Sequence, residues 1–543
     1  MVYNPRAIRF AQVAMFRSSI LAAVLVALCG TATAGALPER LVKAAQDRIA
    51  AGQYPALVIA TVDDGKTTVQ GFGGADGDTV FEIGSITKTF TGLLLAEAVT
   101  DGRVTLDEPV AKLLPDFTIP SRNGKEITLG NLSDQHSGLP RMPDNIQPAD
   151  PLNPYADYDS VALRMFLGKY TLPRDPDSAY EYSNLGEGLL GYALTQGDYG
   201  AAVQHDIFAP LGMTSSGIVI DANMRAHLAQ GHDGDGKPTK NWDFGALAGC
   251  GAIKSTANDM VRYLRANMGV DKTPLYPAMQ LAHTPRADMD KLDRVGLAWI
   301  TRTMPSGTIM WHNGMTGGYA SFLGFTADGR HGVVVLTNVM ASVDDLGFAA
   351  LDASVPLAPA RHYLAMSRDE LVPYQGLYKL SDAMNIRVLR VDAQLYIQAT
   401  GQGPIAIYPT APNTFFTKVG DIGISFVRDG KTVSALVLHQ GGDHTAPRLP
   451  DAPHVMLPPE VLAQYVGQYI LAPGHVLTAT VDGGQLTMQL TGQPAFPIFA
   501  SAKDHFFYEI VDARIDFERD ANGAVSALVL HQNGRDLRAP RAP

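Results

Sequence analysis

The 543-residue sequence has few cysteines, no excess of positive charge and no long hydrophobic run. Without a run of 18 or more apolar residues, the chain cannot form several membrane-spanning helices. A net charge of −11 argues against nucleic-acid binding. The composition is 46% hydrophobic and 18% charged, which is typical of a globular protein with enough apolar material for two or more cores.

Two common catalytic signatures are also absent. There is no H-E-x-x-H, which argues against a metalloprotease, and no G-x-S-x-G, which argues against an α/β-hydrolase. His227 and His232 are five residues apart, with Gly231 between them, so they do not have the spacing of the zinc-binding histidines in H-E-x-x-H. We therefore expect neither a metal nor another cofactor.

The N-terminus has the pattern of an export signal. Three arginines within residues 1–17 precede the apolar run 20–29, and small residues follow at Ala32 and Ala34. A positive segment, a short apolar segment and an A-x-A-type site predict a signal peptide over residues 1–34. The apolar run is short for an uncleaved anchor. We expect a periplasmic or secreted protein with no stable membrane insertion after cleavage.

Cleavage would change both the charge and the cysteine count. Residues 1–34 hold three arginines and no acidic residue, so the mature chain would have a net charge of −14. Cys250 would be its only cysteine, which excludes an intramolecular disulfide. Cys250 lies in a segment of small residues, and we expect it to be buried rather than reactive.

The first part of the chain after this segment mixes helical and strand-like patterns. Strand-like runs stand at both ends, and helical periodicity dominates between them. The expected strands are 56–64, 321–329 and 331–339, and the expected helices include 37–52, the segment after Ser85, and 255–269 with a Ser/Thr cap. This order predicts an α+β domain, in which helices pack on an antiparallel sheet.

The last part of the chain is repeated. SALVLHQGG at 434–442 returns as SALVLHQNG at 526–534, and YQGLY at 374–378 returns as YVGQY at 465–469. Two matches at nearly one offset indicate a duplication. Many short alternating strands predict that each copy is a small antiparallel barrel or sandwich.

These patterns predict three domains after the signal peptide. The expected bounds are residues 37–365 for the mixed α+β domain, 366–455 for the first β-barrel repeat and 456–543 for the second. A proline-rich joint at 449–460 links the two copies.

Ser85 and Lys88 form the strongest candidate for chemistry. They stand three residues apart at the start of an apolar helix, so both side chains lie on one face of its first turn. A serine hydroxyl is a weak nucleophile that needs a base beside it, and a lysine acts as a base only when it is uncharged. The helix N-terminus also directs N–H groups toward negative charge forming on a substrate. The alternative is a serine cap followed by a surface lysine.

Tyr182 and Asn184 belong to the only Y-x-N in the chain. A tyrosine hydroxyl can relay the serine proton to a leaving group, and an asparagine amide can bind both a lysine and a substrate carbonyl. Taken alone, the pair also fits an ordinary turn before a helix of small residues.

His312 and Gly314 lie on a predicted strand that ends in a glycine-rich turn. Other H-x-G triplets occur, so the strand is what favours this one. Gly314 would allow close approach of a substrate backbone. The N–H of Met315 is then a candidate second oxyanion donor, beside the N-terminus of the Ser85 helix.

The order Ser-x-x-Lys, Tyr-x-Asn, His-x-Gly resembles the penicillin-binding-protein and class C β-lactamase superfamily of serine hydrolases. The resemblance covers about residues 40–350 and includes VTLDEPVAKLLPDF, ITLGNLSDQHSGLP and GCGAIKSTANDMVRYL. It implies a β-lactamase/transpeptidase-like domain, Ser85 as the acylated nucleophile, Lys88 and Tyr182 as the base system, and Asn184 as a substrate contact. His312 takes the position of the third motif. The layout with two C-terminal barrels is similar to that of D-aminopeptidases.

His312 departs from the lysine usual at that position, which helps to attract a substrate carboxylate. A histidine is largely neutral at pH 7, which weakens the case for efficient β-lactam hydrolysis or D-alanine trimming. We expect a peptidase or amidase acting on a small peptide, amide or ester. A β-lactamase or D-alanyl-D-alanine carboxypeptidase, an esterase, and a non-catalytic peptidoglycan-fragment binder are the alternatives, and no oligomeric state is predicted.

A neighbouring cluster could be mistaken for a catalytic triad. Asp134, His136 and Ser137 stand together in SDQHSG, but sequence neighbours rarely converge as a triad does. We expect a structural turn near the cleft.

Overall fold

The computed structural model describes residues 35–542 apart from short gaps, at 362, 382–383, 392, 401–403, 419–421, 441, 451–454, 473, 483, 493–494, 509–512 and 533–534. The predicted signal peptide, residues 1–34, lies outside the described residues. Within the described part, no helix is both long and apolar enough to cross a bilayer.

An eight-stranded antiparallel sheet forms the centre of the first domain. Its order is β2-β1-β12-β11-β10-β9-β8-β7, so β1 from the start of the domain pairs with β12 from its end, and the predicted antiparallel sheet is confirmed. The bounds are β1 Leu57–Asp63, β2 Lys66–Phe72, β7 Ala287–Asp288, β8 Asp293–Val295, β9 Ile300–Met304, β10 Gly307–Met315, β11 Ala320–Thr326 and β12 His331–Thr337.

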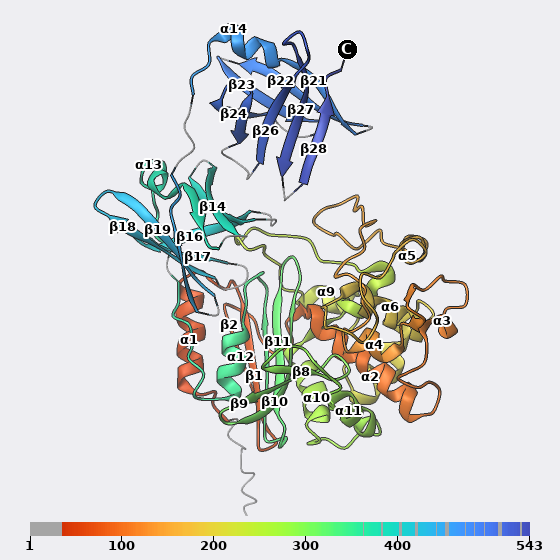
Figure 1. Cartoon of the computed structure of the whole chain (residues 1–543). Coiled ribbons are helices and arrows are strands. Elements are labelled where there is room, and N and C mark those ends of the chain that lie inside the picture. Colours follow the sequence, from red (N-terminus) through yellow and green to blue (C-terminus); the bar gives the residue numbers. More distant parts are fainter. Residues whose placement is uncertain are drawn as a thin grey trace, which may run out of the picture.

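Helices cover both faces of this sheet (Figure 1). The longer helices are α1 Glu39–Ala50, α2 Thr87–Thr100, α5 Ser160–Leu167, α6 Asn184–Thr195, α10 Ala257–Asn267, α11 Tyr276–His283 and α12 Asp344–Leu351. The shorter ones are α3 Val110–Leu113, α4 Leu129–Ser133, α7 Tyr199–Ala202, α8 Ala209–Leu211 and α9 Ala222–His227.

The two faces of the sheet belong to two hydrophobic cores. Leu57 and Ile59 pack with α1 and α12, whereas Val58 and Ala60 pack on the side of α2 and α10. Because both faces are covered, β1 reads LVIATVD, a nearly continuous hydrophobic run instead of an alternating one. The cap predicted for α10 is Thr256, whose hydroxyl accepts a hydrogen bond from the N–H of Asp259 at 3.1 Å.

Two further eight-stranded antiparallel sheets follow, and each closes into a nearly complete barrel. Isolated bridges between Tyr378 and Arg448 and between Tyr469 and Arg541 join the first and last strands. The first barrel contains β13 Gly376–Lys379, β14 Asn385–Val391, β15 Gln394–Ala399, β16 Ile405–Ala411, β17 Thr414–Thr417, β18 Gly423–Asp429, β19 Thr432–His439 and β20 Asp443–Pro447. The second contains β21 Gly467–Ala472, β22 His475–Asp482, β23 Gln485–Leu490, β24 Ala495–Ala502, β25 His505–Tyr508, β26 Ala513–Arg519, β27 Val525–Gln532 and β28 Arg535–Pro540.

Equivalent contacts recur in both barrels, as a duplication requires. The Tyr378 hydroxyl donates to the carbonyl of Tyr374 at 2.7 Å, and the Tyr469 hydroxyl donates to that of Tyr465 at the same distance. Short helices α13 Arg368–Leu371 and α14 Pro459–Leu462 precede the two barrels. In Figure 1 the first barrel lies against the α+β domain and the second lies beyond it.

Candidate active site

Ser85 lies between a short strand and a buried helix. Strand β3 (Val80–Glu82) pairs with β6 (Lys254–Thr256), and the 3₁₀ turn η1 (Gly84–Ile86) then leads directly into α2. Most of α2 is buried, because the helix is enclosed by the larger of the two cores. Ser85 is half-buried and Lys88 is fully buried, which rules out a surface lysine at this position.

The Lys88 ammonium nitrogen makes three hydrogen bonds. It lies 2.9 Å from Ser85 Oγ, 2.9 Å from Asn184 Oδ1 and 2.7 Å from the carbonyl oxygen of Cys250. The last two oxygens can only accept, so each binds one N–H of the lysine. The third hydrogen-bonding position of Lys88 Nζ therefore points at the hydroxyl of Ser85.

Tyr182 completes the surroundings of the serine. Its hydroxyl donates to Ser85 Oγ at 2.7 Å, so two polar groups converge on that oxygen. Lys88 Nζ and the Arg141 guanidinium carbon lie 4.8 Å and 5.0 Å from the centre of the Tyr182 ring. Cation–π attraction from Arg141, and from Lys88 whenever it carries its charge, stabilises the position of the ring.

The start of helix α6 positions Asn184. Ser183 caps this helix, and its hydroxyl accepts from the N–H of Gly186 at 2.8 Å. The backbone N–H of Asn184 donates to the carbonyl of Arg141 at 3.0 Å. A capped helix start therefore holds the amide side chain against Lys88.

His312 lies on β10 and is only 3% exposed. Its Nδ1 lies 2.5 Å from the carbonyl oxygen of Asn313, so this nitrogen carries the proton of the neutral ring. Burial, and secondarily the positive charge of Lys88, lowers the pKa of His312 to about 3. The ring is therefore uncharged at neutral pH.

The turn that carries Ser85 packs directly on β10. A Cβ added at Gly314 would lie 2.0 Å from the carbonyl oxygen of Ile83 and 2.9 Å from the N–H nitrogen of Ser85. A Cβ at Gly84, whose φ is +50°, would lie 2.7 Å from the N–H nitrogen of Met315. These close contacts bring the two expected oxyanion donors, the backbone nitrogens of Ser85 and Met315, to the same place.

The explanation predicted for Gly314 needs a correction. The sequence suggested that the missing side chain lets a substrate backbone approach. In the structure the space beside its Cα is filled by the protein's own backbone at residues 83–85. Gly314 therefore allows the serine turn to approach the strand, although it also borders the cavity.

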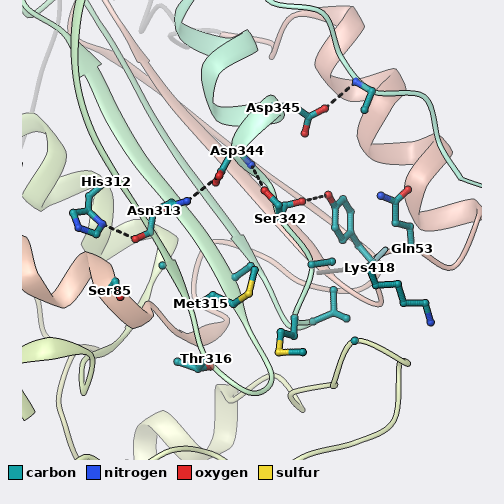
Figure 2. Close-up of a pocket in the computed structure, with 18 of the residues that line it drawn as sticks. Gln53, Ser85, His312, Asn313, Met315, Thr316, Ser342, Asp344, Asp345 and Lys418 are labelled. Atoms are coloured by element: carbon teal, nitrogen blue, oxygen red, sulfur yellow. Dashed lines mark hydrogen bonds between the residues drawn. The ribbon is translucent and has the colours of Figure 1, made fainter. Parts of the chain in front are cut away.

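The predicted residues meet at one cavity of about 950 Å³. Its lining includes six of the residues that the sequence singled out, Ser85, Tyr182, Asn184, His312, Gly314 and Met315, while Lys88 is buried behind Ser85. Figure 2 shows Ser85 beside His312 at one end and Lys418, at the start of the β17–β18 connection, at the other.

The site includes groups that the sequence analysis did not find. The carbonyl of Cys250 binds Lys88, and burial raises the pKa of the Cys250 thiol to about 11, as expected for an inert buried cysteine. Glu187 is fully buried, its carboxylate oxygen accepts from Gln135 at 3.3 Å, and burial raises its pKa well above the ordinary value. Glu187 lies three residues after Asn184, but the sequence around it does not indicate that its side chain is buried near Lys88.

The neighbouring Asp-His-Ser cluster is structural, as expected. His136 Nδ1 lies 2.7 Å from the carbonyl oxygen of Asp134, and the hydroxyl of Ser137 accepts from the N–H of Leu139. The Asp134 carboxylate accepts from Arg286 at 3.3 Å. Among the described residues, no group of three or more His, Cys, Asp or Glu side chains could hold a metal ion.

Solved structures share the fold of the first domain. A class C β-lactamase matches 59% of this chain and 97% of its own, with a TM-score of 0.51 and 21% identity. A class C β-lactamase from Rhodobacter sphaeroides matches 56% of this chain and 96% of its own, with a TM-score of 0.50 and 24% identity. A serine, a lysine and a tyrosine are in hydrogen-bond contact within this fold, and together with the family and relatives described next they show a serine hydrolase.

The chain belongs to the Beta-lactamase family, whose model matches residues 40–355. A domain of unknown function, DUF3471, matches residues 451–540. A β-lactamase of Escherichia coli (strain K12) is 26% identical over 373 residues, which is 60% of this chain and 95% of the relative. The D-alanyl-D-alanine-carboxypeptidase/endopeptidase AmpH of the same strain is 28% identical over 279 residues, 48% of this chain and 71% of the relative.

Proposed function

We propose that this protein is a peptidase or amidase that cleaves small or linear peptides, D-residue-containing peptides among them, through an acyl-enzyme on Ser85. The observation that carries the proposal is the convergence of Lys88 and Tyr182 on Ser85 Oγ, at 2.9 and 2.7 Å. A serine hydroxyl in contact with a lysine and a tyrosine, either of which can accept its proton once it has lost its own, has what covalent acyl transfer needs.

In the proposed acylation step, Ser85 Oγ attacks the substrate carbonyl as its proton moves to Lys88 or Tyr182. An uncharged Lys88 would keep its two N–H bonds to Asn184 and Cys250 and accept the serine proton through its lone pair. Burial raises the pKa of Glu187 well above its ordinary value, and a protonated Glu187 would place no negative charge beside the lysine. The uncharged amine itself stays a prediction.

The oxyanion would bind the backbone N–H groups of Ser85 and Met315, and Tyr182 would pass the proton to the leaving group. Water then attacks the acyl-enzyme, with the same base system taking its proton. Because these backbone N–H groups are held in fixed positions, they can stabilise the oxyanion without having to move during the reaction.

Two features support a peptide substrate. Residues 312–315 pair with β11 on one side, but β9 pairs with β10 only as far as Trp311, so among the described strands none covers their other edge, and these residues border the cavity. An extended peptide can add to such an exposed edge. The neutral His312 also offers no cation for the carboxylate that β-lactams and D-alanyl termini carry.

A second candidate function, D-alanyl-D-alanine carboxypeptidase or β-lactamase, is supported by the names of the relatives. One E. coli relative is called a carboxypeptidase/endopeptidase and another a β-lactamase. Both candidates share the acyl-enzyme chemistry proposed for Ser85. We further propose export to the periplasm or medium, which the pattern of residues 1–34 supports.

Four substrates assayed side by side test this proposal: a D-amino-acid amide, a linear peptide, a chromogenic cephalosporin and a short p-nitrophenyl ester. We expect turnover of the amide, the peptide and the ester, with slow hydrolysis of the cephalosporin. Rapid turnover of the cephalosporin alone would favour the β-lactamase function over the proposed peptidase or amidase function. A fluorescent probe that acylates reactive serines should label the wild type but not Ser85→Ala. Equal labelling of both proteins would exclude the acyl-enzyme on Ser85.

A further inference from the structure

Arg141 is a cation at the catalytic end of the cavity. It lies in the connection between α4 and α5 and lines the same cavity as Ser85, Tyr182 and Asn184. Its guanidinium carbon lies 5.0 Å from the centre of the Tyr182 ring, and the hydroxyl of that ring donates to Ser85 Oγ at 2.7 Å. A single tyrosine side chain therefore separates the Arg141 charge from the nucleophile.

The backbone of Arg141 is fixed against the catalytic residues. Its carbonyl accepts hydrogen bonds from the N–H groups of Asn184 at 3.0 Å and Leu185 at 3.3 Å, at the start of α6. The sulfur of the next residue, Met142, lies 3.5 Å from the hydroxyl of Tyr155 and 3.7 Å from the amide nitrogen of Asn184. The position of the Arg141 backbone is therefore coupled to that of Asn184.

The guanidinium of Arg141 is available to a ligand. Among the residues that the structure describes, it forms no ion pair and no hydrogen bond, and its close contact is with the face of the Tyr182 ring. The side chain is exposed, and its five N–H donors have no acceptor within that part of the protein. A fixed backbone with an unpaired cationic head group is the arrangement expected of a ligand contact.

The other positive groups along the cavity already have partners. Arg48 and Lys418 each lie within ion-pair distance of an aspartate, and Arg361 donates to a backbone carbonyl of the first barrel at 3.5 Å. His312 is uncharged at neutral pH, because burial lowers its pKa to about 3. Close to Ser85, the charge that can attract a negative part of a substrate is therefore that of Arg141.

Aromatic side chains border the same end of the cavity. Tyr155, Tyr180 and Trp242 line it, and the ring centres of Tyr155 and Trp242 lie 5.2 Å apart. Such walls suit the apolar body of a ligand, and an ion pair beside them is stronger than one in open water. The planar guanidinium can bind a carboxylate through two parallel N–H···O bonds.

We propose that Arg141 binds a carboxylate of the substrate close to the reacting bond, which makes it a specificity-determining residue. The substrate class is then a peptide or amide with a carboxylate on a residue next to the bond that Ser85 attacks. This group is a free C-terminus on the leaving side or an acidic side chain on the acyl side, and both present the same planar anion. The inference rests on the proposed function, because it assumes that Ser85 is the reacting group.

Two matched pairs of substrates test this role. In the first pair the leaving residue ends in a free carboxylate or in an amide, and in the second pair the acyl residue is Glu or Gln. We expect kcat/KM of the wild type to favour the carboxylate by about tenfold in at least one pair, and Arg141→Gln to reduce this ratio below about twofold. A preference in the first pair alone would identify the carboxylate as a C-terminus, and one in the second alone as a side chain.

Two further variants serve as controls. Arg141→Lys keeps the charge but loses the paired N–H geometry, so we expect an intermediate ratio. Arg164→Gln removes another exposed arginine that lies over an aromatic ring, that of Phe117 at 4.7 Å, but Arg164 does not line the cavity. We expect Arg164→Gln to keep the wild-type ratios. Thermal unfolding of each variant shows whether it is folded.

The outcomes separate this inference from the proposed function. If Arg141→Gln lowers both members of each pair equally, the arginine only positions Tyr182 and the inference is overturned. If the wild type cleaves all four substrates without preferring a carboxylate, the binding role is wrong while the chemistry at Ser85 stands. If no substrate is cleaved and Ser85 takes no acyl probe, the proposed function fails and the inference fails with it.

Discussion

Replacing Gly314 with alanine tests whether close packing between the serine turn and β10 aligns the oxyanion donors. The new Cβ would lie 2.0 Å from the carbonyl oxygen of Ile83, and this atom belongs to the backbone, so it cannot rotate away. Relief to an ordinary contact requires a separation of roughly 1 Å between the turn and the strand. A misplacement of that size at a reaction centre costs about 100-fold in rate, equivalent to about 2.7 kcal/mol.

The assay is kcat/KM for a short p-nitrophenyl ester, measured together with the free energy of unfolding. Gly324→Ala on the neighbouring strand β11 is the matched control. Its Cβ would meet only side-chain atoms, each at 3.1 Å, from Leu351, Phe322 and Trp311. We expect this control to lose some stability but to stay within about twofold of the wild-type rate.

Two results would refute the reasoning about Gly314. A folded Gly314→Ala enzyme with wild-type kcat/KM would show that the turn can move without disturbing the donors. An equal loss of rate in Gly324→Ala would show that any overpacking of the sheet reduces activity. In either case the backbone contact would not explain why glycine stands at this position.

The other predictions concern Ser85 itself and four side chains around it. Ser85→Ala should abolish both turnover and probe labelling, and Lys88→Ala and Tyr182→Phe should each lower kcat/KM by several orders of magnitude; near-normal activity of Lys88→Ala would contradict its role as base. Glu187→Gln should keep both activity and melting temperature, because burial raises the pKa of this carboxyl and so favours the protonated form that the amide resembles; a large loss would mean that its negative charge is needed. His312 has a pKa of about 3, below its ordinary value near 6.5, so the unfolded chain binds the extra proton and stability falls as pH drops from 7 toward 3. Urea unfolding at pH 7 and pH 5 should show that His312→Gln removes about 2 kcal/mol of this loss, and equal pH dependence in both proteins would show that the ring is not held neutral.

Local patterns predicted much of this protein correctly. The spacing of Ser85 and Lys88 predicted that both lie at the start of a buried helix, and the structure places Ser85 in the 3₁₀ turn that leads into α2 and Lys88 in its first turn. The repeated YQGLY and YVGQY segments indicated two copies of one β-barrel. Strand-like runs at 56–64 and 331–339 predicted the sheet in which β1 and β12 now pair. Helical and strand periodicities are local properties, so they can be read without knowing which elements meet.

The remaining features depended on contacts between distant parts of the chain. The Cys250 carbonyl binds Lys88 across 162 positions of sequence, and the sequence analysis did not anticipate that Glu187 is a buried acid with a raised pKa. Gly314 was assigned to substrate approach, but tertiary packing fills that space with the serine turn. The sequence by itself predicted the candidate catalytic residues and indicated the repeats, because side-chain type and periodicity are local. Only the tertiary structure decided which backbone groups surround the serine and that Lys418 faces the same cavity, because burial and approach arise when separate elements pack together.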